Sequence, residues 1–220
     1  MKIIQSFWTG KHQNLNFGFG WSSAKYNYLS WILSACQLRK YYDELELFTD
    51  KLGYNLLIEK LNLPYTKVHV VLDELNKYDD NLWALAKIKA YSVMKEPFLH
   101  VDGDVFIFEA FDDDLISRGV ITQNIETTSN YYWEMWTKIK PQLTFIPECI
   151  ANYDQKIHSK AYNMGIFGGH NLSFINEYAK TSFNFVNENK NNLSKRNAYN
   201  FNIFFEQVLL YELTNQKKLK

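Results

Sequence analysis

The chain has 220 residues, of which 46% are hydrophobic and 17% aromatic. This composition predicts one sizeable packed domain over residues 1–220 and excludes a largely disordered protein. Lys+Arg and Asp+Glu both number 24, so the formal net charge is +0, and this balance argues against a nucleic-acid-binding protein.

The sequence carries no sign of export. Cys36 and Cys149 lack the spacing of metal ligands and are expected to be reduced thiols in a cytosolic protein. The first ten residues hold too short an apolar run for a signal peptide. No stretch approaches the ~20 apolar residues of a membrane helix. A cytoplasmic protein without a transmembrane segment is therefore expected.

Strands and helices are expected to alternate along the chain. Strands are expected at residues 2–7, 45–49, 66–71, 98–108, 119–124 and 162–167. Helices are expected at about residues 22–42, 50–61, 82–94, 172–189 and 200–213. A Gly-rich loop follows the first strand, and residues 187–197 form a polar connection. The alternation predicts a three-layer α/β/α fold with a mostly parallel mixed central sheet.

Two aspartates interrupt the apolar run "FLHVDGDVFIF" of the fourth strand. Asp102 and Asp104 are two residues apart, so on a strand their side chains point to the same face. Gly103 between them lets a ligand approach the backbone closely. Buried carboxylates cost free energy unless they are paired or hold a metal. The pair therefore predicts a Mg²⁺ or Mn²⁺ site that keeps positions open for phosphate groups.

Two other interpretations of the aspartate pair stay open, and two neighbouring features have expectations of their own. The strand could already have ended, which would make both aspartates solvated turn residues. Haloacid-dehalogenase-type phosphatases also place D-x-D after a strand, but Phe106 stands where they favour Thr or Val, and no later Gly-Asp-x-x-x-Asp motif follows. His100 shares the face of the aspartates and is expected to be a packed strand histidine. The Asp112–Asp114 run is expected to be a solvated turn or a helix start.

Taken together, these segments resemble a GT-A glycosyltransferase, which has a Rossmann-like fold. The resemblance runs through "KIIQSFWTG", "LFTDKLG", "NLWALAKIKAYSVM", "FLHVDGDVFIF", "AYNMGIFGG" and "FNIFFEQVLL", and so covers nearly the whole chain. The order is most similar to the retaining, glycogenin-like and galactosyltransferase-like branches, and to bacterial families with this fold. D-x-D is the most specific of these matches.

The resemblance implies roles for residues around the donor. Asp102 and Asp104 match the motif that binds the metal and the donor's ribose and diphosphate. Lys87 is similar to the basic residue that faces the donor, and Lys89 competes with it for that role. Trp8 and Thr9 are similar to the segment beneath the nucleotide base, although Trp8 also fits a core position.

Asn163 and Gly165 come near the transferred sugar by the same resemblance. An amide in that place can hydrogen-bond sugar hydroxyls. The alternative is an ordinary strand, followed by a Gly168-Gly169 turn into a helix capped by Asn171.

Glu206 is the charged member of an otherwise apolar row on the last predicted helix. A first row faces the core and consists of Phe201, Phe204, Phe205, Val208 and Leu209. The second row consists of Ile203, Glu206, Leu210 and Leu213. A carboxylate buried there needs a partner or a cleft. The resemblance implies a catalytic or acceptor-site acid, and a structural carboxylate is the alternative.

The implied function is a metal-dependent transfer of a sugar from a UDP- or GDP-sugar to a saccharide or lipid-linked saccharide, with retention favoured over inversion. The expected setting is bacterial surface glycan synthesis, in the cytoplasm or at the inner membrane face. One departure is that His170 is the last histidine, so a C-terminal histidine ligand and the lid over the donor are expected to be missing. The rival functions are a non-catalytic domain that binds nucleotide-sugars or carbohydrates, and a D-x-D phosphatase or nucleotidyltransferase.

Overall fold

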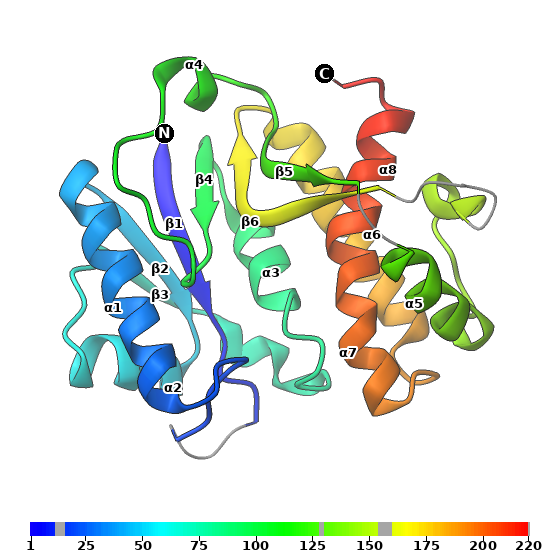
Figure 1. Ribbon diagram of the computed structural model, residues 1–220, viewed down its shortest axis with the longest axis horizontal. Coiled ribbons are helices and arrows are strands. Elements are labelled where there is room, and N and C mark those ends of the chain that lie inside the picture. Colours follow the sequence, from blue (N-terminus) through cyan, green and yellow to red (C-terminus); the bar gives the residue numbers. More distant parts are fainter. Residues whose placement is uncertain (12–15, 128–129, 154–159, 220) are drawn as a thin grey trace.

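The computed structural model describes residues 1–11, 16–127, 130–153 and 160–219, and its centre is a six-stranded sheet (Figure 1). The strands are β1 (Lys2–Phe7), β2 (Leu45–Thr49), β3 (Lys67–Val70), β4 (Phe98–Val101), β5 (Ile121–Glu126) and β6 (Ala161–Gly169). Their order across the sheet is β3-β2-β1-β4-β6-β5. The β1–β2, β2–β3 and β1–β4 pairs are parallel, whereas β6 runs antiparallel to both β4 and β5.

Helices cover both faces of this sheet. The α-helices are α1 (Ala24–Tyr41), α2 (Lys51–Tyr54), α3 (Leu85–Val93), α4 (Asp113–Ile116), α5 (Tyr131–Ile139), α6 (Leu172–Asn189), α7 (Lys195–Ile203) and α8 (Leu209–Gln216). Short 3₁₀ segments are η2 (Leu72–Lys77), η3 (Lys140–Gln142) and η4 (Glu148–Ile150). Two π-helical turns, η1 (Asn55–Lys60) and η6 (Phe204–Val208), continue α2 and α7. The predicted three-layer α/β arrangement with a mostly parallel mixed sheet is confirmed.

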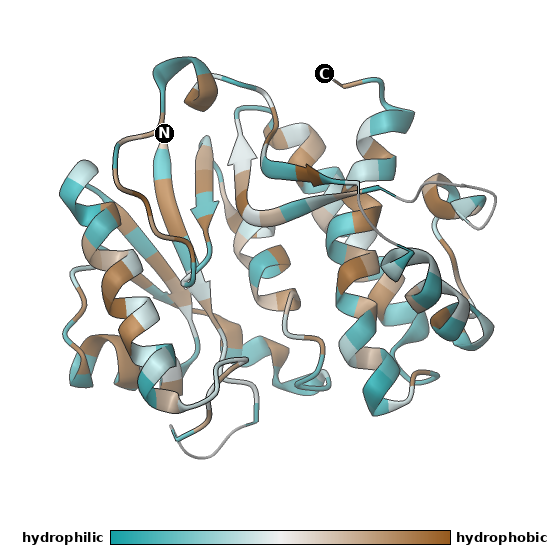
Figure 2. Ribbon diagram, in the orientation of Figure 1, coloured by the Kyte–Doolittle hydropathy of each residue, from teal (hydrophilic) through white to brown (hydrophobic). Residues whose placement is uncertain are grey.

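Alternation along the strands divides the apolar side chains between two cores. Ile3 and Leu99 are paired across β1 and β4 and face α1, where Trp31 covers them. Ile4 and Phe98 point to the opposite face and join a larger core under α3 and α6. The hydropathy colouring shows apolar residues along β1 and β4, whereas β5 is largely hydrophilic (Figure 2).

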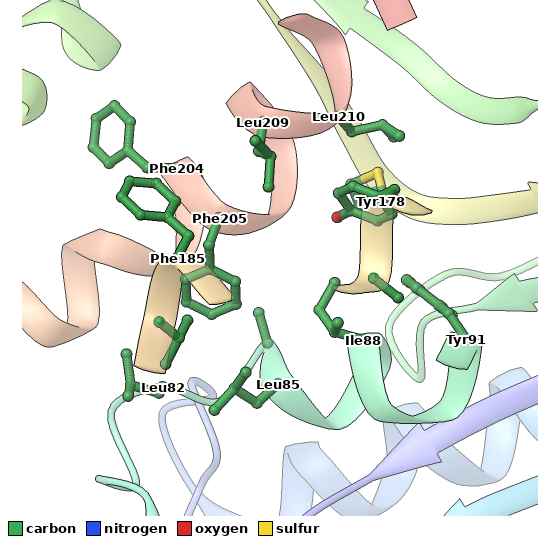
Figure 3. Close-up of a cluster of buried hydrophobic side chains, with 14 of the residues drawn as sticks. Leu82, Leu85, Ile88, Tyr91, Tyr178, Phe185, Phe204, Phe205, Leu209 and Leu210 are labelled. Atoms are coloured by element: carbon green, nitrogen blue, oxygen red, sulfur yellow. The ribbon is translucent and has the colours of Figure 1, made fainter. Parts of the chain in front are cut away.

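The larger core is rich in aromatic rings, which come from α3, α6 and the C-terminal helices (Figure 3). Tyr91 of α3 packs against Phe98 and Phe167 of the sheet, with ring centroids 5.7 and 4.7 Å apart. On the other side of this core, Phe201 contacts Phe185 and Phe205. The C-terminal helices are thereby fixed against the half of the sheet that contains β4 and β6.

The structure corrects four details of the predicted elements. β4 ends at Val101, not at Phe108, because the chain turns at the aspartates. α5 and the 3₁₀ segments were not predicted. The predicted helix over 200–213 comprises the end of α7, η6 and most of α8, so it contains a π-helical turn. The polar connection between α6 and α7 is shorter than expected, because α7 starts at Lys195 and not at about residue 200.

The order of the strands creates a switch point between β1 and β4. β2 and β3 follow β1 in the chain and lie in turn on one side of it. β4, the next strand in the chain, lies on the other side of β1. In open α/β sheets, ligands bind at such a point, outside the carboxyl ends of the strands. None of the helices among the described residues has the length and apolar character needed to cross a membrane.

The close approach of β4 and β6 leaves no room for a side chain at Gly168, which can be tested by substitution. A Cβ added there would lie 1.9 Å from the carbonyl oxygen of Phe98, so Gly168→Ala must push the two strands apart. We expect a loss of at least about 2 kcal/mol in the free energy of unfolding, measured by urea denaturation. Gly119→Ala is the control, because its Cβ would meet Asn171 at an ordinary 3.7 Å. Equal stability of the two variants would contradict this account of the strand contact.

Candidate active site

A cleft of about 590 Å³ opens at the carboxyl ends of β1 and β4. Its floor contains Trp8 and Thr9, which follow β1, and residues 102–104, which follow β4. One wall comes from the loop after β1 and from α1, and includes Trp21 and Trp31. The other wall comes from the segment before α3 and from α7. The cleft therefore lies at the switch point of the sheet.

The two aspartates belong to a turn that leaves β4, not to the strand itself. The backbone N–H of Asp102 still donates to Gly165 of β6 at 2.8 Å, but the N–H of Val105 donates back to the carbonyl of Asp102 at 3.1 Å. Asp102 keeps 22% of its side chain exposed, and Asp104 is exposed. Both line the cleft. The turn interpretation is correct, but Asp102 is not a freely solvated turn residue.

Hydroxyl groups of α1 hold this turn in place. Ser30 Oγ donates to the carbonyl of Gly103 at 2.6 Å, and Ser34 Oγ donates to the carbonyl of Val105 at 2.8 Å. A Cβ on Gly103 would lie 2.5 Å from the Trp31 ring. Glycine is therefore required because the turn presses against α1, which adds a packing reason to the predicted ligand approach.

Lys87 of α3 is the basic residue beside the aspartate turn. Its Nζ lies 2.6 Å from Asp102 Oδ2 and 2.8 Å from Glu206 Oε1, and it donates to the carbonyl of Met164 at 3.3 Å. Lys89, its competitor in the sequence, instead pairs with Glu74 at 2.7 Å. The structure thus brings Lys87, and not Lys89, to Asp102 and Glu206.

Glu206 reaches Lys87 from the π-helical turn η6 and is fully buried. Such turns occur often at functional sites. Tyr178 Oη donates to the main-chain carbonyl of Glu206 at 2.7 Å, which helps to hold the turn. Glu206 Oε2 has no hydrogen-bond partner in the part of the chain that the structure describes. The sequence predicted a partner or a cleft for this carboxylate, and the structure provides the partner.

Burial dominates the acid–base properties of this group. It raises the pKa of Asp102 to about 7, with Lys87 opposing the shift and Glu206 and Asp104 adding to it. It also raises the pKa of Glu206, again against Lys87. Burial alone would lower the pKa of Lys87, but its two carboxylate partners hold that pKa above the ordinary value. One ammonium facing two carboxylates leaves an excess negative charge, which a proton or a cation can neutralise.

His100 lies in the core beneath the turn, as expected of a packed strand histidine. Its Nε2 is 2.9 Å from Ser6 Oγ, and Tyr91 packs edge-on against its ring. Burial lowers the pKa of His100 well below its ordinary value, so the ring is neutral at physiological pH. Its Nδ1 lies 3.6 Å from Asp102 Oδ1, too far for a hydrogen bond.

Trp8 and Thr9 are held rigidly at the floor of the cleft. Trp8 is nearly buried, and its indole N–H donates to Asn76 at 3.1 Å. Thr9 donates through its N–H and its hydroxyl to Asp50 Oδ2, at 2.9 and 2.6 Å. Asp50 also caps α2 by accepting from the N–H of Gly53. Trp8 therefore belongs both to the core and to the cleft floor.

Asn163 and Gly165 lie on β6, next to the aspartate turn. The Asn163 amide donates to Glu126 at 2.9 Å and its oxygen accepts the N–H of Gly165 at 2.9 Å. A Cβ on Gly165 would lie 2.2 Å from Gln123 Oε1, so the Gln123 side chain would have to move. Among the described residues that line the cleft, neither of these two nor Glu206 appears. Their proposed roles at the sugar remain predictions.

The sequence did not indicate the aromatic walls of the cleft. Trp21, Trp83 and Tyr199 line it and are largely exposed. Their positions in the chain are far apart, so no local spacing marks them as one set. The one available signal was Trp83, which lies outside the apolar face of the predicted helix over residues 82–94. Such a position is unusual for so large an apolar ring.

Asp102 and Asp104 are the residues available to hold a cation. Within the described residues, no group of three or more His, Cys, Asp or Glu side chains is placed to bind a metal. Two carboxylates nonetheless match the way Mg²⁺ is held when phosphates and water complete its coordination. The excess negative charge around Lys87 fits the same purpose. The site is thus compatible with a cation that binds together with a phosphate-bearing ligand.

The buried charge group predicts the effect of removing the ammonium. Lys87→Met leaves Glu206 without its charged partner and is expected to cost about 3–5 kcal/mol in the free energy of unfolding, measured by urea denaturation. Adding Glu206→Gln should recover part of this loss, because the orphaned charge is then gone. Lys89→Met is the matched control and should cost less than about 1 kcal/mol. A double variant no more stable than Lys87→Met would show that the ion pair is not the cause.

The raised pKa of Asp102 predicts a pH-dependent stability. Its pKa is about 7 in the folded chain against an ordinary 3.8, so the folded state binds the extra proton between these values. The associated stabilisation is complete below about pH 4 and is lost as the pH rises through about 7. Wild type should therefore lose stability relative to Asp102→Asn across this window, in thermal melts without metal. A difference that is constant with pH would contradict the shift.

Comparisons with known proteins place the chain in a family. A comparison of this sequence with curated proteins found no match. Among solved structures, the apo form of mouse xyloside xylosyltransferase 1 aligns with 93% of this chain and 82% of its own, at 9% identity and a TM-score of 0.39. The model of a family described as "Family of unknown function (DUF6734)" matches residues 1–220. The chain therefore belongs to this family, DUF6734.

Proposed function

We propose that the chain is a metal-dependent glycosyltransferase of the GT-A type, which moves a sugar from a nucleotide-sugar to a hydroxyl acceptor. The observation that carries the proposal is the aspartate turn at the switch point, where Asp102 and Asp104 face an open cleft. A nucleotide diphosphate needs a cation and a basic residue beside its phosphates, and Lys87 lies against Asp102.

In this proposal Asp102 and Asp104 hold Mn²⁺ or Mg²⁺. The cation would supply a positive charge that stabilises the departing diphosphate. Lys87 keeps the Asp102 carboxylate in a fixed direction through the 2.6 Å contact. Because the turn is fastened to α1 through Ser30, the carboxylates are positioned before a ligand arrives.

The donor is a UDP- or GDP-sugar, with its nucleoside over Trp8 and Thr9. Both residues line the floor of the cleft and are held by hydrogen bonds to Asn76 and Asp50, so they offer a rigid surface. Rigid groups lose little entropy when a ligand binds. This end of the cleft is therefore the proposed nucleoside subsite.

The reacting sugar is proposed to lie towards β6, near Asn163 and Gly165, with Glu206 beneath it as the acidic residue. The bond from the anomeric carbon to the diphosphate breaks, the acceptor oxygen takes the sugar, and the hydroxyl proton passes to the released diphosphate. The chain contributes by orienting the two reactants. Retention is the favoured outcome. The acceptor is a saccharide or lipid-linked saccharide of bacterial surface glycan synthesis, in the cytoplasm or at the inner membrane face.

A thermal-shift experiment tests this function. A ligand that binds only the folded state raises the melting temperature, so UDP or GDP with Mn²⁺ should stabilise the wild type more than either component alone. Asp102→Asn and Asp104→Asn should each abolish the metal-dependent part of the shift. Asp43→Asn, an exposed aspartate outside the cleft, is the control and should keep it. A full shift in both site variants would refute the proposed site.

Turnover assays separate the rival functions. Release of nucleoside diphosphate from a UDP- or GDP-sugar, together with glycosylated acceptor, is the expected result. Saturable binding without any turnover would favour a non-catalytic domain that binds nucleotide-sugars or carbohydrates. Phosphate release from simple phosphate esters would favour the phosphatase.

A further inference from the structure

Two exposed aromatic rings stand on the wall of the cleft that adjoins α3. Trp83 is 39% exposed and precedes α3, and Tyr199 is 56% exposed and belongs to α7. Both line the cleft. Open aromatic rings in a concave site are a feature of binding surfaces, because their apolar faces remain to be covered.

Hydrogen bonds fix the wall that carries these rings. Asn202 of α7 accepts the N–H of Ala84 at 2.9 Å and donates to the carbonyl of Asn81 at 2.6 Å. It also donates to the carbonyl of Tyr199 at 2.8 Å. Asn202 is fully buried, so this clamp is shielded from water. The segment of Trp83 and the helix of Tyr199 are therefore held as one rigid unit.

Trp83 is adjacent to the charged group of the site. Lys87 Nζ lies 5.6 Å from the centroid of the Trp83 ring and 2.6 Å from Asp102. A single ammonium thus separates the exposed ring from the aspartate turn. A ligand stacked on Trp83 would be positioned beside the reacting groups.

The polar group next to this wall favours a ligand rich in hydroxyls. Asp80 lines the cleft, and its Oδ1 is buried without a hydrogen-bond partner among the described residues. A carboxylate accepts hydrogen bonds from neutral hydroxyls and repels phosphate.

We propose that Trp83 and Tyr199 form a stacking platform for a pyranose ring of the saccharide acceptor. In this arrangement, the Asp80 carboxylate accepts a hydrogen bond from one hydroxyl of that ring. A pyranose combines an apolar C–H face with a rim of hydroxyls, which matches two aromatic rings in a cleft that a carboxylate also lines. The assignment to the acceptor rests on the proposed function, in which the nucleoside occupies Trp8 and Thr9. The platform would select among acceptor saccharides, which the aspartate turn does not do.

A glycan array tests the platform without requiring turnover. The full chain is applied to a printed array of glycans, and the best-bound glycan is then titrated by calorimetry. Trp83→Ala and Tyr199→Ala should each weaken its binding by a factor on the order of 10. Tyr199→Phe keeps the ring and should stay within about twofold of wild type. Trp133→Ala removes a comparably exposed tryptophan of α5, outside the cleft, and should behave as wild type.

The nucleotide response serves as the separate readout. Each of these variants should keep the full Mn²⁺-dependent shift with UDP or GDP. Three results would overturn the platform: no glycan bound by the wild type, wild-type affinity in Trp83→Ala, or loss of the nucleotide shift with glycan binding intact. A wild type that binds glycans but shows no nucleotide shift would refute the proposed transferase while leaving a saccharide-binding platform.

Discussion

The ammonium of Lys87, enclosed between Asp102 and Glu206, joins the parts of the molecule on which the site depends. Lys87 and its two partners come from three separate elements: α3, the turn after β4, and the π-helical turn η6. Buried charges are tolerated only as paired groups, so none of the three elements can move far without exposing an uncompensated charge. The electrostatic demand of one side chain thereby fixes the distance between the sheet edge and the C-terminal helices. Phe205, the neighbour of Glu206 in the chain, is fully buried in the larger core.

Much of the fold could be predicted because its signals are local. β1, β2 and β6 follow apolar runs bounded by turn residues, and α6 was predicted with the bounds that the structure shows. The candidate site was accessible for a similar reason. Asp102 and Asp104 stand out within an apolar run, and Glu206 stands out within an apolar helical row. Charged residues in apolar surroundings are costly, so their presence carries information that a single sequence displays.

The remaining features arise from contacts between distant residues. The end of β4 is set by Ser30 and Ser34 of α1, whose hydroxyls bind the turn, while the sequence continues as if the strand went on to Phe108. α5 was missed because its Tyr and Trp residues favour strands, and tertiary packing of Trp136 overrides that preference. The walls of the cleft combine residues from the two ends of the chain. No spacing rule in one sequence brings Trp83 and Tyr199 to the same cleft.

The clamp formed by Asn202 has a consequence for the order in which parts of the protein fold during synthesis. Its partners, Asn81 and Ala84, are synthesised more than a hundred residues earlier. Contacts of such long sequence separation form late, because the loop between them must close first. A chain emerging from the ribosome therefore exposes the wall of Trp83, and the acidic turn without Glu206, until α7 and η6 have been made. The cleft is complete only after these two elements have packed against α3, so ligand binding reports directly on that folding step.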